Sequence, residues 1–347
     1  MTSSPDPALA AVVGKPESEA IIAALREEGV YDPARKVRER DDETVELPVT
    51  DPPTETAVLD VVEQVAPERR LPDLDAHLRE RGWSDDEIAR APGSWAVVGS
   101  VVLVTFDGAA FDPDRGDLDR GEVGEALLDL HGEADTVLAR EGVSGELREP
   151  SVEVVAGTGD TETVHAEHGT RYALDFSEVM FSPGNKAERA RMGEVVAPGE
   201  RVFDMFAGIG YFTLPMARAG ADVTATEKNP ASFRYLIENA MLNDVSDRVS
   251  AFRADCRDVQ LDPAADRVVM GYYEAHEYLD SALAALKPGG VVHLHEATPE
   301  ELLWNRPVSR LHAAASERGR EVEVLDRRRV KSHSEGVWHV VVDARVD

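Results

Sequence analysis

Residues 202–227 constrain the fold of this 347-residue chain more than any other segment. An apolar strand pattern ends at Asp204, and the loop 204–210 reads Asp-Met-Phe-Ala-Gly-Ile-Gly and leads into a helical pattern. Gly208 and Gly210 let the backbone turn tightly and bring a ligand close to the strand and to the helix N-terminus. A second apolar strand pattern ends at Glu227. The segment therefore predicts a βαβ unit that binds a nucleoside.

Acidic residues end three successive predicted strands in this region. Asp204 is placed to bond the amino-acid end of a ligand, Glu227 to accept both ribose hydroxyls, and Asp255 to accept an adenine amino group. The backbone N–H of Cys256 is placed to bond a ring nitrogen. The third glycine of a dinucleotide fingerprint would fall at Thr213, which disfavours a pyrophosphate. The pattern favours S-adenosylmethionine (SAM); the alternative is a tight turn with solvated carboxylates.

Strand and helix patterns alternate from about residue 172, which is typical of a parallel sheet. Two closing strands lie close together in sequence and are expected to pair antiparallel. The predicted strands are 200–205, 222–227, 248–254, 266–270, 291–295, 321–325 and 337–346, and the predicted helices are 210–219, 231–242, 276–286 and 299–318.

Two smaller α+β units are predicted upstream of this domain. The first contains a helix over 16–28 and a strand over 44–49, and the sequence Asp-Pro-Pro-Thr at 51–54 forms the linker. In the second, the apolar stretch 95–106 predicts a strand or a strand pair, and 122–130 predicts an amphipathic helix. The predicted domains are residues 1–53, 54–170 and 171–347.

The net charge of −30, from 67 acidic and 37 basic residues, would ordinarily argue against a nucleic-acid partner. Adaptation to a salt-saturated cytoplasm, as in a halophilic archaeon, is the favoured explanation, because the Debye length falls to about 3 Å at 1 M salt. Local basic clusters then become candidate phosphate contacts, although pairing with neighbouring acids is a common alternative. These clusters are Arg35, Lys36, Arg38 and Arg40, then Arg69 and Arg70, and finally Arg327, Arg328, Arg329 and Lys331.

The chain carries no sign of secretion or membrane insertion. No basic or apolar signal segment follows Met1, and the longest apolar stretch, 95–106, is too short to cross a bilayer. A single cysteine, Cys256, excludes an internal disulfide framework. These features predict a cytoplasmic protein.

Several residues beyond the nucleoside site are candidates for acting on a second substrate. Tyr272 and Tyr273 follow the carboxyl end of a predicted strand, where they either stack on a base or pack against the next helix. His293 and His295 share one face of a strand, and Glu296 follows. Too few further ligands surround them for zinc, so no metal is expected. His295 or Glu296 could serve as a general base, although such histidines are more often packed and hydrogen-bonded.

The segment 179–189, together with the loop at 204–210, resembles the tRNA guanosine-37 N1-methyltransferases and their wyosine-pathway relatives. The resemblance covers nearly the whole chain, and it implies that residues 1–53 form a tRNA-recognition unit. It implies a Rossmann-like class I SAM-dependent methyltransferase fold, with a seven-stranded, mostly parallel sheet and smaller N-terminal α+β domains. It also implies that Ser182 and Arg189 lie on a segment that closes over SAM, where Arg189 could pair with a carboxylate. The alternative for Arg189 is a surface helix residue in an i,i+4 ion pair.

Two segments, 271–279 and 292–296, resemble the archaeal wyosine-pathway aminocarboxypropyltransferases more than the methyltransferases, which carry an Asn-Leu-Pro-like segment after the fourth strand. Ala275 and Leu294 depart from that pattern. The resemblance implies transfer of the 3-amino-3-carboxypropyl group of SAM to 4-demethylwyosine at position 37, in the anticodon loop of tRNA(Phe), by a monomeric enzyme.

Such a change of transferred group is chemically possible, because a sulfonium has three attached carbons and the nucleophile attacks whichever one is held in line. Methylthioadenosine would then be the by-product. The alternatives are a tRNA guanosine-37 N1-methyltransferase and a non-catalytic SAM- or RNA-binding module.

Overall fold

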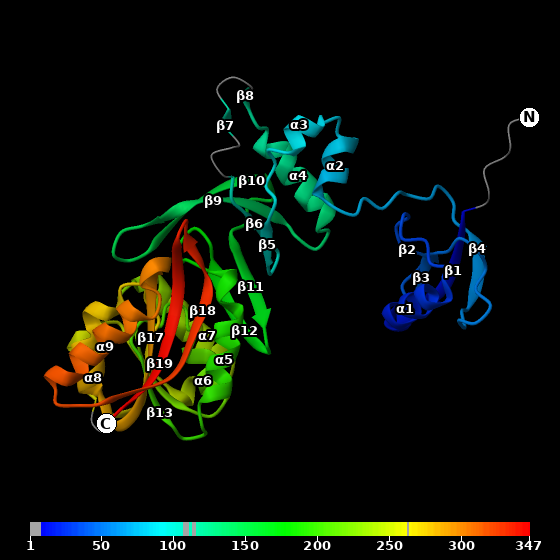
Figure 1. The fold of residues 1–347 in the computed structure, drawn as a ribbon. Helices are drawn as coiled ribbons and strands as arrows, with labels where there is room; N and C mark the ends of the chain where they lie inside the picture. The colour runs from blue at the N-terminus through cyan, green and yellow to red at the C-terminus, as the bar shows by residue number, and fades with distance from the viewer. Residues whose placement is uncertain (1–7, 107–110, 113–115, 262–263) are drawn as a thin grey trace, which may run out of the picture. The chain divides into compact units, whose positions relative to one another are not determined.

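The computed structural model describes residues 8–106, 111–112, 116–261 and 264–347, and the chain divides into two compact units, 1–89 and 90–347 (Figure 1). In the first unit a four-stranded sheet, in the order β2-β3-β1-β4, packs its apolar side chains with helix α1. Gly29, at a φ of 80°, ends α1 as the sequence predicted. The elements are β1 (Leu9–Gly14), α1 (Ser18–Glu28), β2 (Arg38–Glu39), β3 (Thr44–Pro48), β4 (Asp60–Glu63), α2 (Leu74–Glu80) and α3 (Asp85–Ile88).

The second unit begins with a smaller sheet in the order β10-β9-β6-β5. The apolar stretch 95–106 forms a strand pair, because β5 and β6 pair antiparallel across a tight turn in which Gly99 has a φ of 59°. The elements are β5 (Trp95–Val98), β6 (Val101–Val104), β7 (Phe111–Asp112), β8 (Gly116–Asp117), α4 (Arg120–Leu130), β9 (Thr136–Ser144) and β10 (Glu149–Gly157).

A separate hairpin of β11 (Glu162–Glu167) and β12 (Thr170–Asp175) follows this sheet. Its two strands pair from Glu162 with Asp175 to Glu167 with Thr170. The domain boundary predicted at 170/171 therefore falls within one hairpin.

The main sheet has seven strands in the order β15-β14-β13-β16-β17-β19-β18. The first five pair parallel, and β19 is antiparallel to both β17 and β18, which confirms the predicted mainly parallel sheet. The strands are β13 (Arg201–Asp204), β14 (Asp222–Thr226), β15 (Val249–Phe252), β16 (Ala265–Met270), β17 (Leu286–Pro299), β18 (Val322–Ser334) and β19 (Val337–Val346).

Helices cover both faces of this sheet (Figure 1). One core contains Met192, Leu214 and Leu236 from three helices on one face, and the other contains Leu283 and Leu311 from two helices on the opposite face. No helix in the described part of the chain is long and apolar enough to cross a membrane. The helices are α5 (Lys186–Val195), α6 (Thr213–Arg218) and α7 (Pro230–Leu242) on the first face, and α8 (Leu279–Ala285) and α9 (Asn305–Glu317) on the second.

Strand β18 is longer than predicted. The sequence pattern ended this strand at residue 325, but the pairing with β19 continues to Ser334. The run of charges at 326–331 interrupts the apolar alternation that marks a strand. In the structure several of these charges are satisfied by partners on other elements, such as Glu188 on α5, so the strand continues.

Candidate functional site

A cavity of about 330 Å³ opens where β13, β14 and β16 end, within the second unit. This volume lies in the range of small-molecule binding sites. Its wall combines residues from the main sheet, from the β9–β10 hairpin and from β18. The lining includes Arg140, Val143, Arg148, Met180, Ser182, Arg189, Phe206, Gly208, Tyr211, Phe212, Glu227, Cys256, Tyr272, Tyr273, His295, Lys331, His333 and His339.

Glu227 closes the turn between β13 and α6. Its two carboxylate oxygens accept the backbone N–H groups of Gly208 at 2.8 Å and Asn229 at 2.7 Å. Gly208 has a φ of 57°, and a Cβ there would lie 2.3 Å from the ring of Tyr211. Burial raises the pKa of Glu227. A half-buried carboxylate in a cavity wall is placed to accept hydrogen bonds from ligand hydroxyls.

Asp204 and Gly210 lie beneath the cavity and are not among its lining residues. Asp204 is fully buried, and it accepts hydrogen bonds from the Thr213 hydroxyl at 2.7 Å and from the Phe206 N–H at 3.4 Å. Gly210 has a φ of 102°, and a Cβ there would lie 2.7 Å from Leu214. Both residues therefore stabilise the conformation of the loop 204–210.

Asp204 makes stability depend on pH. Burial raises its pKa to about 6, so the folded state binds this proton more tightly than the unfolded state does. The contribution of Asp204 is greatest below pH about 4 and is lost as the pH rises to about 6. We expect Asp204→Asn to remove this decline, as measured by melting temperature between pH 4 and 8. Identical pH profiles for the two proteins would contradict this.

The end of β15 differs from the prediction. The carboxylate of Asp255 is bound by Arg257, with Nε–Oδ1 2.9 Å and Nη2–Oδ2 2.6 Å, and by Lys228 at 3.1 Å, and these cations lower its pKa. Asp255 is not a lining residue, whereas Cys256 is, and burial raises the pKa of its thiol to about 12. After β15, therefore, Cys256 rather than Asp255 forms part of the cavity wall.

Tyr272 and Tyr273 are both packed and exposed to the cavity. The Tyr272 ring lies 5.3 Å from the Phe206 ring, tilted by 33°, and its hydroxyl donates to Glu274 at 2.7 Å. The Tyr273 ring lies 4.9 Å from the His339 ring. Both tyrosines line the cavity. Each tyrosine therefore packs against a neighbouring ring and also lies at the cavity, where a base can stack on it.

Arg189 is 2% exposed and binds Glu167 with two nitrogens, at 2.7 and 2.8 Å. Although burial opposes it, the hydrogen bonds with His165 and Arg189 lower the pKa of Glu167 to about 2. A third nitrogen donates to the Ser182 carbonyl at 2.9 Å. The interpretation of Arg189 as a surface helix residue is wrong, because β11 supplies its carboxylate partner.

Lys331 lies against the same segment, with Nζ hydrogen-bonded to the Ser182 hydroxyl. Burial and the charges of Arg140, Arg189 and Arg148 lower the pKa of Lys331 to about 8. Of the predicted basic clusters, this lysine is the member that lines the cavity.

Glu296 and His293 are not among the residues that line the cavity. Glu296 is 1% exposed and its carboxylate is bound by Arg306 at 2.7 Å and Arg310 at 2.9 Å. The candidacy of Glu296 as a general base is therefore not supported, because two arginines occupy its carboxylate away from the cavity. His293 is held between Asp343 and Arg267, each at 2.6 Å, which confirms a packed, hydrogen-bonded histidine.

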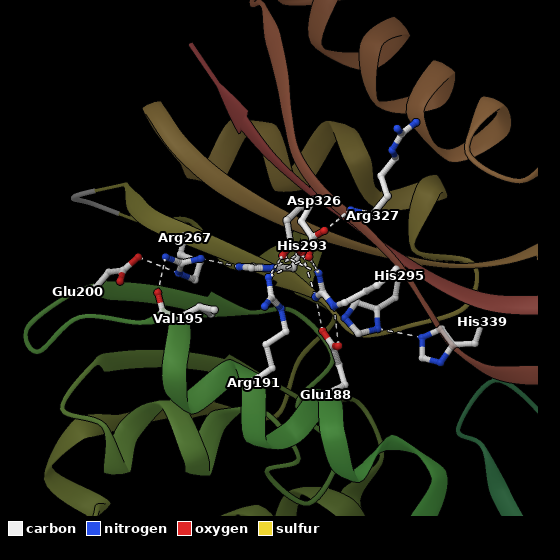
Figure 2. A network of polar contacts seen from close by, with 12 residues as sticks. Glu188, Arg191, Val195, Glu200, Arg267, His293, His295, Asp326, Arg327 and His339 are labelled. Carbon is white, nitrogen blue, oxygen red and sulfur yellow. Dashed lines mark hydrogen bonds and ion pairs between the residues drawn. The ribbon is translucent and has the colours of Figure 1, made fainter.

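A buried charge network surrounds His293 (Figure 2). Arg328 on β18 bonds Glu188 on α5, with Nε–Oε2 2.8 Å, and Asp343 on β19, with Nη1–Oδ2 2.7 Å. The basic residue Arg35 in the first unit is likewise internal, since it bonds Asp32 at 2.7 Å and two carbonyls. Arg35 and Arg328 are therefore held in ion pairs within the fold and are not free phosphate contacts.

His295 is 1% exposed, lines the cavity, and has Nδ1 3.0 Å from Nε2 of His339. Burial lowers its pKa to about 3. Among the three candidate catalytic residues, the structure brings His295 and Tyr272 to the cavity and leaves Glu296 outside. In the described ranges no cluster of three or more His, Cys, Asp or Glu side chains is arranged to hold a metal ion.

Sequence reasoning missed the part of the wall that comes from the β9–β10 hairpin. Arg140 and Val143 on β9 and Arg148 in the turn lie far from the SAM motif in sequence. Arg148 has a φ of 57°, which is unusual for a non-glycine residue, but this backbone conformation cannot be read from the sequence.

The strand order, the glycine loop at the end of β13 and the carboxylate at the end of β14 define a SAM-dependent transferase of the Rossmann-like methyltransferase fold. The family model described as the TRM5/TYW2 methyltransferase domain matches residues 163–325, and the TYW2 N-terminal domain matches 74–161.

Among curated proteins, the tRNA(Phe) (4-demethylwyosine(37)-C(7)) aminocarboxypropyltransferase of Pyrococcus horikoshii is 41% identical over 259 residues, which are 74% of this chain and 90% of that protein. The crystal structure of P. horikoshii TYW2 in complex with MeSAdo matches with a TM-score of 0.66 and 36% identity, over 78% of this chain and 97% of that one. Trm5b from Pyrococcus abyssi matches with a TM-score of 0.71 and 31% identity, over 98% and 99%. The chain belongs to the TRM5/TYW2 family of SAM-dependent tRNA-modifying transferases, which confirms the resemblance seen in the sequence.

Proposed function

We propose that this protein transfers the 3-amino-3-carboxypropyl group of SAM to C7 of 4-demethylwyosine at position 37 of tRNA(Phe), releasing methylthioadenosine. The observation that carries this proposal is a single cavity that contains both Glu227, at the nucleoside end, and the paired tyrosines that follow β16. A donor and a base can meet in one such space at the close approach that transfer needs. The relative that is 41% identical is named an aminocarboxypropyltransferase, and this supports transfer of the aminocarboxypropyl group rather than the methyl group.

In this proposal Gly208 and Glu227 hold the ribose, and the backbone of Cys256 meets the adenine. The segment from Ser182 to Arg189 closes over the amino-acid arm, with the hydroxyl of Ser182 held by Lys331. Asp204 and Gly210 support the loop, and Asp255 orders the end of β15 through Lys228 and Arg257. Tyr272 and Tyr273 stack on the base.

The reaction by-product tests this assignment. Incubation with SAM and tRNA(Phe) carrying 4-demethylwyosine, followed by chromatography of the nucleosides, should yield methylthioadenosine in proportion to modified tRNA. S-adenosylhomocysteine alone would identify a guanosine-37 N1-methyltransferase instead. SAM binding without turnover on any tRNA would identify a non-catalytic module.

We further propose that the protein works as a monomer that contacts the anticodon loop through local cations, and that it works in the salt-rich cytoplasm of a halophilic archaeon, which the acid excess supports. Lys331 and Arg148 lie at the cavity, where a base that enters would bring its phosphates. High salt screens the −30 net charge without removing such close contacts.

This salt proposal predicts a direction for thermal stability. Self-repulsion among 67 acidic residues destabilises the folded state at low ionic strength and is screened above about 1 M salt. We therefore expect the melting temperature to rise steadily from 0.1 to 2 M KCl. A melting temperature that is unchanged or falls over this range would contradict salt adaptation.

A further inference from the structure

Two buried histidines stand in contact at the inner wall of the cavity. His295 on β17 and His339 on β19 are 1% and 2% exposed, and Nδ1 of the first lies 3.0 Å from Nε2 of the second. The two outer nitrogens, Nε2 of His295 and Nδ1 of His339, have no hydrogen-bond partner within the described residues. A buried polar atom left unsatisfied costs about 1–3 kcal/mol, so stability alone does not explain this pair.

The neighbouring histidine on the same strand behaves differently. His293 has both ring nitrogens bonded, to Asp343 and Arg267, and lies outside the cavity wall. His295 and His339 both line the cavity. The two unbonded nitrogens therefore belong to histidines of the cavity wall.

Both rings are neutral at neutral pH. Burial lowers the pKa of His295 to about 3 and that of His339 to about 2. The charged or titratable groups that act on the pair are Arg328, His293 and Asp343 around His295, and Lys331, Glu188 and His333 around His339. A neutral imidazole has one N–H and one lone pair. When Nδ1–H of His295 donates to His339, Nε2 of His295 is left with a lone pair.

We propose that His295 and His339 form a two-ring proton relay, in which Nε2 of His295 accepts the proton displaced from the substrate carbon and His339 acts through it as a positioning residue. This inference rests on the proposed function. The transfer converts the cationic sulfonium of SAM into a neutral thioether and therefore releases one proton. That proton needs an acceptor inside the cavity.

The bond from C7 of the base to the γ-carbon of the aminocarboxypropyl group forms, and the bond from that carbon to sulfur breaks with its electron pair left on sulfur. The C7 proton moves to Nε2 of His295, and its electron pair restores the aromatic ring. The Nδ1 proton of His295 passes to Nε2 of His339, and the Nδ1 proton of His339 is released to water. Both rings end neutral, with their N–H positions exchanged.

Conservative replacements separate the two roles. His295→Asn retains an amide near the Nδ1 position but lacks Nε2, and we expect kcat to fall by about 10²–10⁴-fold with SAM affinity unchanged. His339→Gln retains a group near the Nε2 position but lacks Nδ1, and we expect a smaller loss. With deuterium at C7, the kinetic isotope effect should increase in His295→Asn, because removal of that proton becomes rate-limiting.

Chemical rescue gives a readout that a structural role would not move. The smaller side chain of His295→Ala leaves space at the cavity wall, and added imidazole should restore part of kcat. His293→Ala is the matched control: it should lower the melting temperature, with no imidazole rescue and no increase in the isotope effect.

Failure of the relay and failure of the proposed function give different results. Wild-type protein that produces methylthioadenosine, together with His295→Asn that keeps full kcat, overturns the relay alone. Folded, SAM-binding His295→Ala that shows neither rescue nor a changed isotope effect also overturns it. Wild-type protein that produces only S-adenosylhomocysteine overturns the proposed function, and the carbon-proton relay with it.

Discussion

Replacement of Glu227 by alanine is expected to weaken SAM binding by at least about 100-fold, because each hydrogen bond to a charged group contributes about 1.5–3 kcal/mol and two ribose hydroxyls would lose their acceptor. The same change removes the acceptor of the Gly208 and Asn229 N–H groups, at 2.8 and 2.7 Å, so the loop also loses its shape. Titration calorimetry with SAM measures the effect.

A matched control lies at the other end of the same strand. Asp222 begins β14 and is 59% exposed, where it pairs with Arg248. Asp222→Ala removes one exposed carboxylate from the strand but none from the cavity wall, so SAM affinity should remain within about twofold. Equal losses in the two variants would contradict the placement of the ribose at Glu227.

Replacement of Arg328 by methionine is expected to lower the free energy of unfolding by about 3–5 kcal/mol, the range found when one partner of a buried ion pair is removed. Arg328 is 18% exposed, and its partners Glu188 and Asp343 are 4% and 5% exposed. Without the guanidinium, the buried carboxylates of Glu188 on α5 and Asp343 on β19 would have less positive charge to compensate them. Urea unfolding followed by circular dichroism measures the effect.

The adjacent Arg329 provides the control for this substitution. It is 44% exposed and pairs with Glu300, which is 59% exposed, at 3.3 Å. Arg329→Met should change the free energy of unfolding by less than about 1 kcal/mol, because exposed ion pairs contribute little. A similar loss in both variants would show that strand β18, rather than the buried network, is the sensitive element.

The periodicity of the sequence was sufficient for the main sheet because the parallel strands β13 to β16 are four to six residues long and are followed by a turn or helix signal. Strand β17 was predicted over 291–295 but extends over Leu286–Pro299. The ends of the elements were less predictable. Strand β18 continues to Ser334 through charged residues whose partners come from α5 and β19, and no local pattern reveals pairing across so many residues. The hairpin β11–β12 was similarly hidden, since it joins segments on both sides of a predicted boundary.

The candidate site was predictable where the chemistry is local and unpredictable where it depends on packing. Gly208 and Glu227 follow from the βαβ pattern, and the structure adds a hydrogen bond from the Gly208 N–H to the Glu227 carboxylate. Asp255 and Glu296 were chosen for their positions at strand ends, but neighbouring cations occupy both carboxylates. The pairing of His295 with His339 depends on the antiparallel register of β17 and β19, which only the structure provides.

The most direct test of the account is to follow which carbon of SAM reaches the tRNA. Two samples of SAM, one labelled in the methyl group and one in the aminocarboxypropyl chain, are incubated with tRNA(Phe) that carries 4-demethylwyosine. We predict that the tRNA acquires only the aminocarboxypropyl label and that the methyl label leaves with methylthioadenosine. Methyl label on the tRNA, with S-adenosylhomocysteine in solution, would contradict the account.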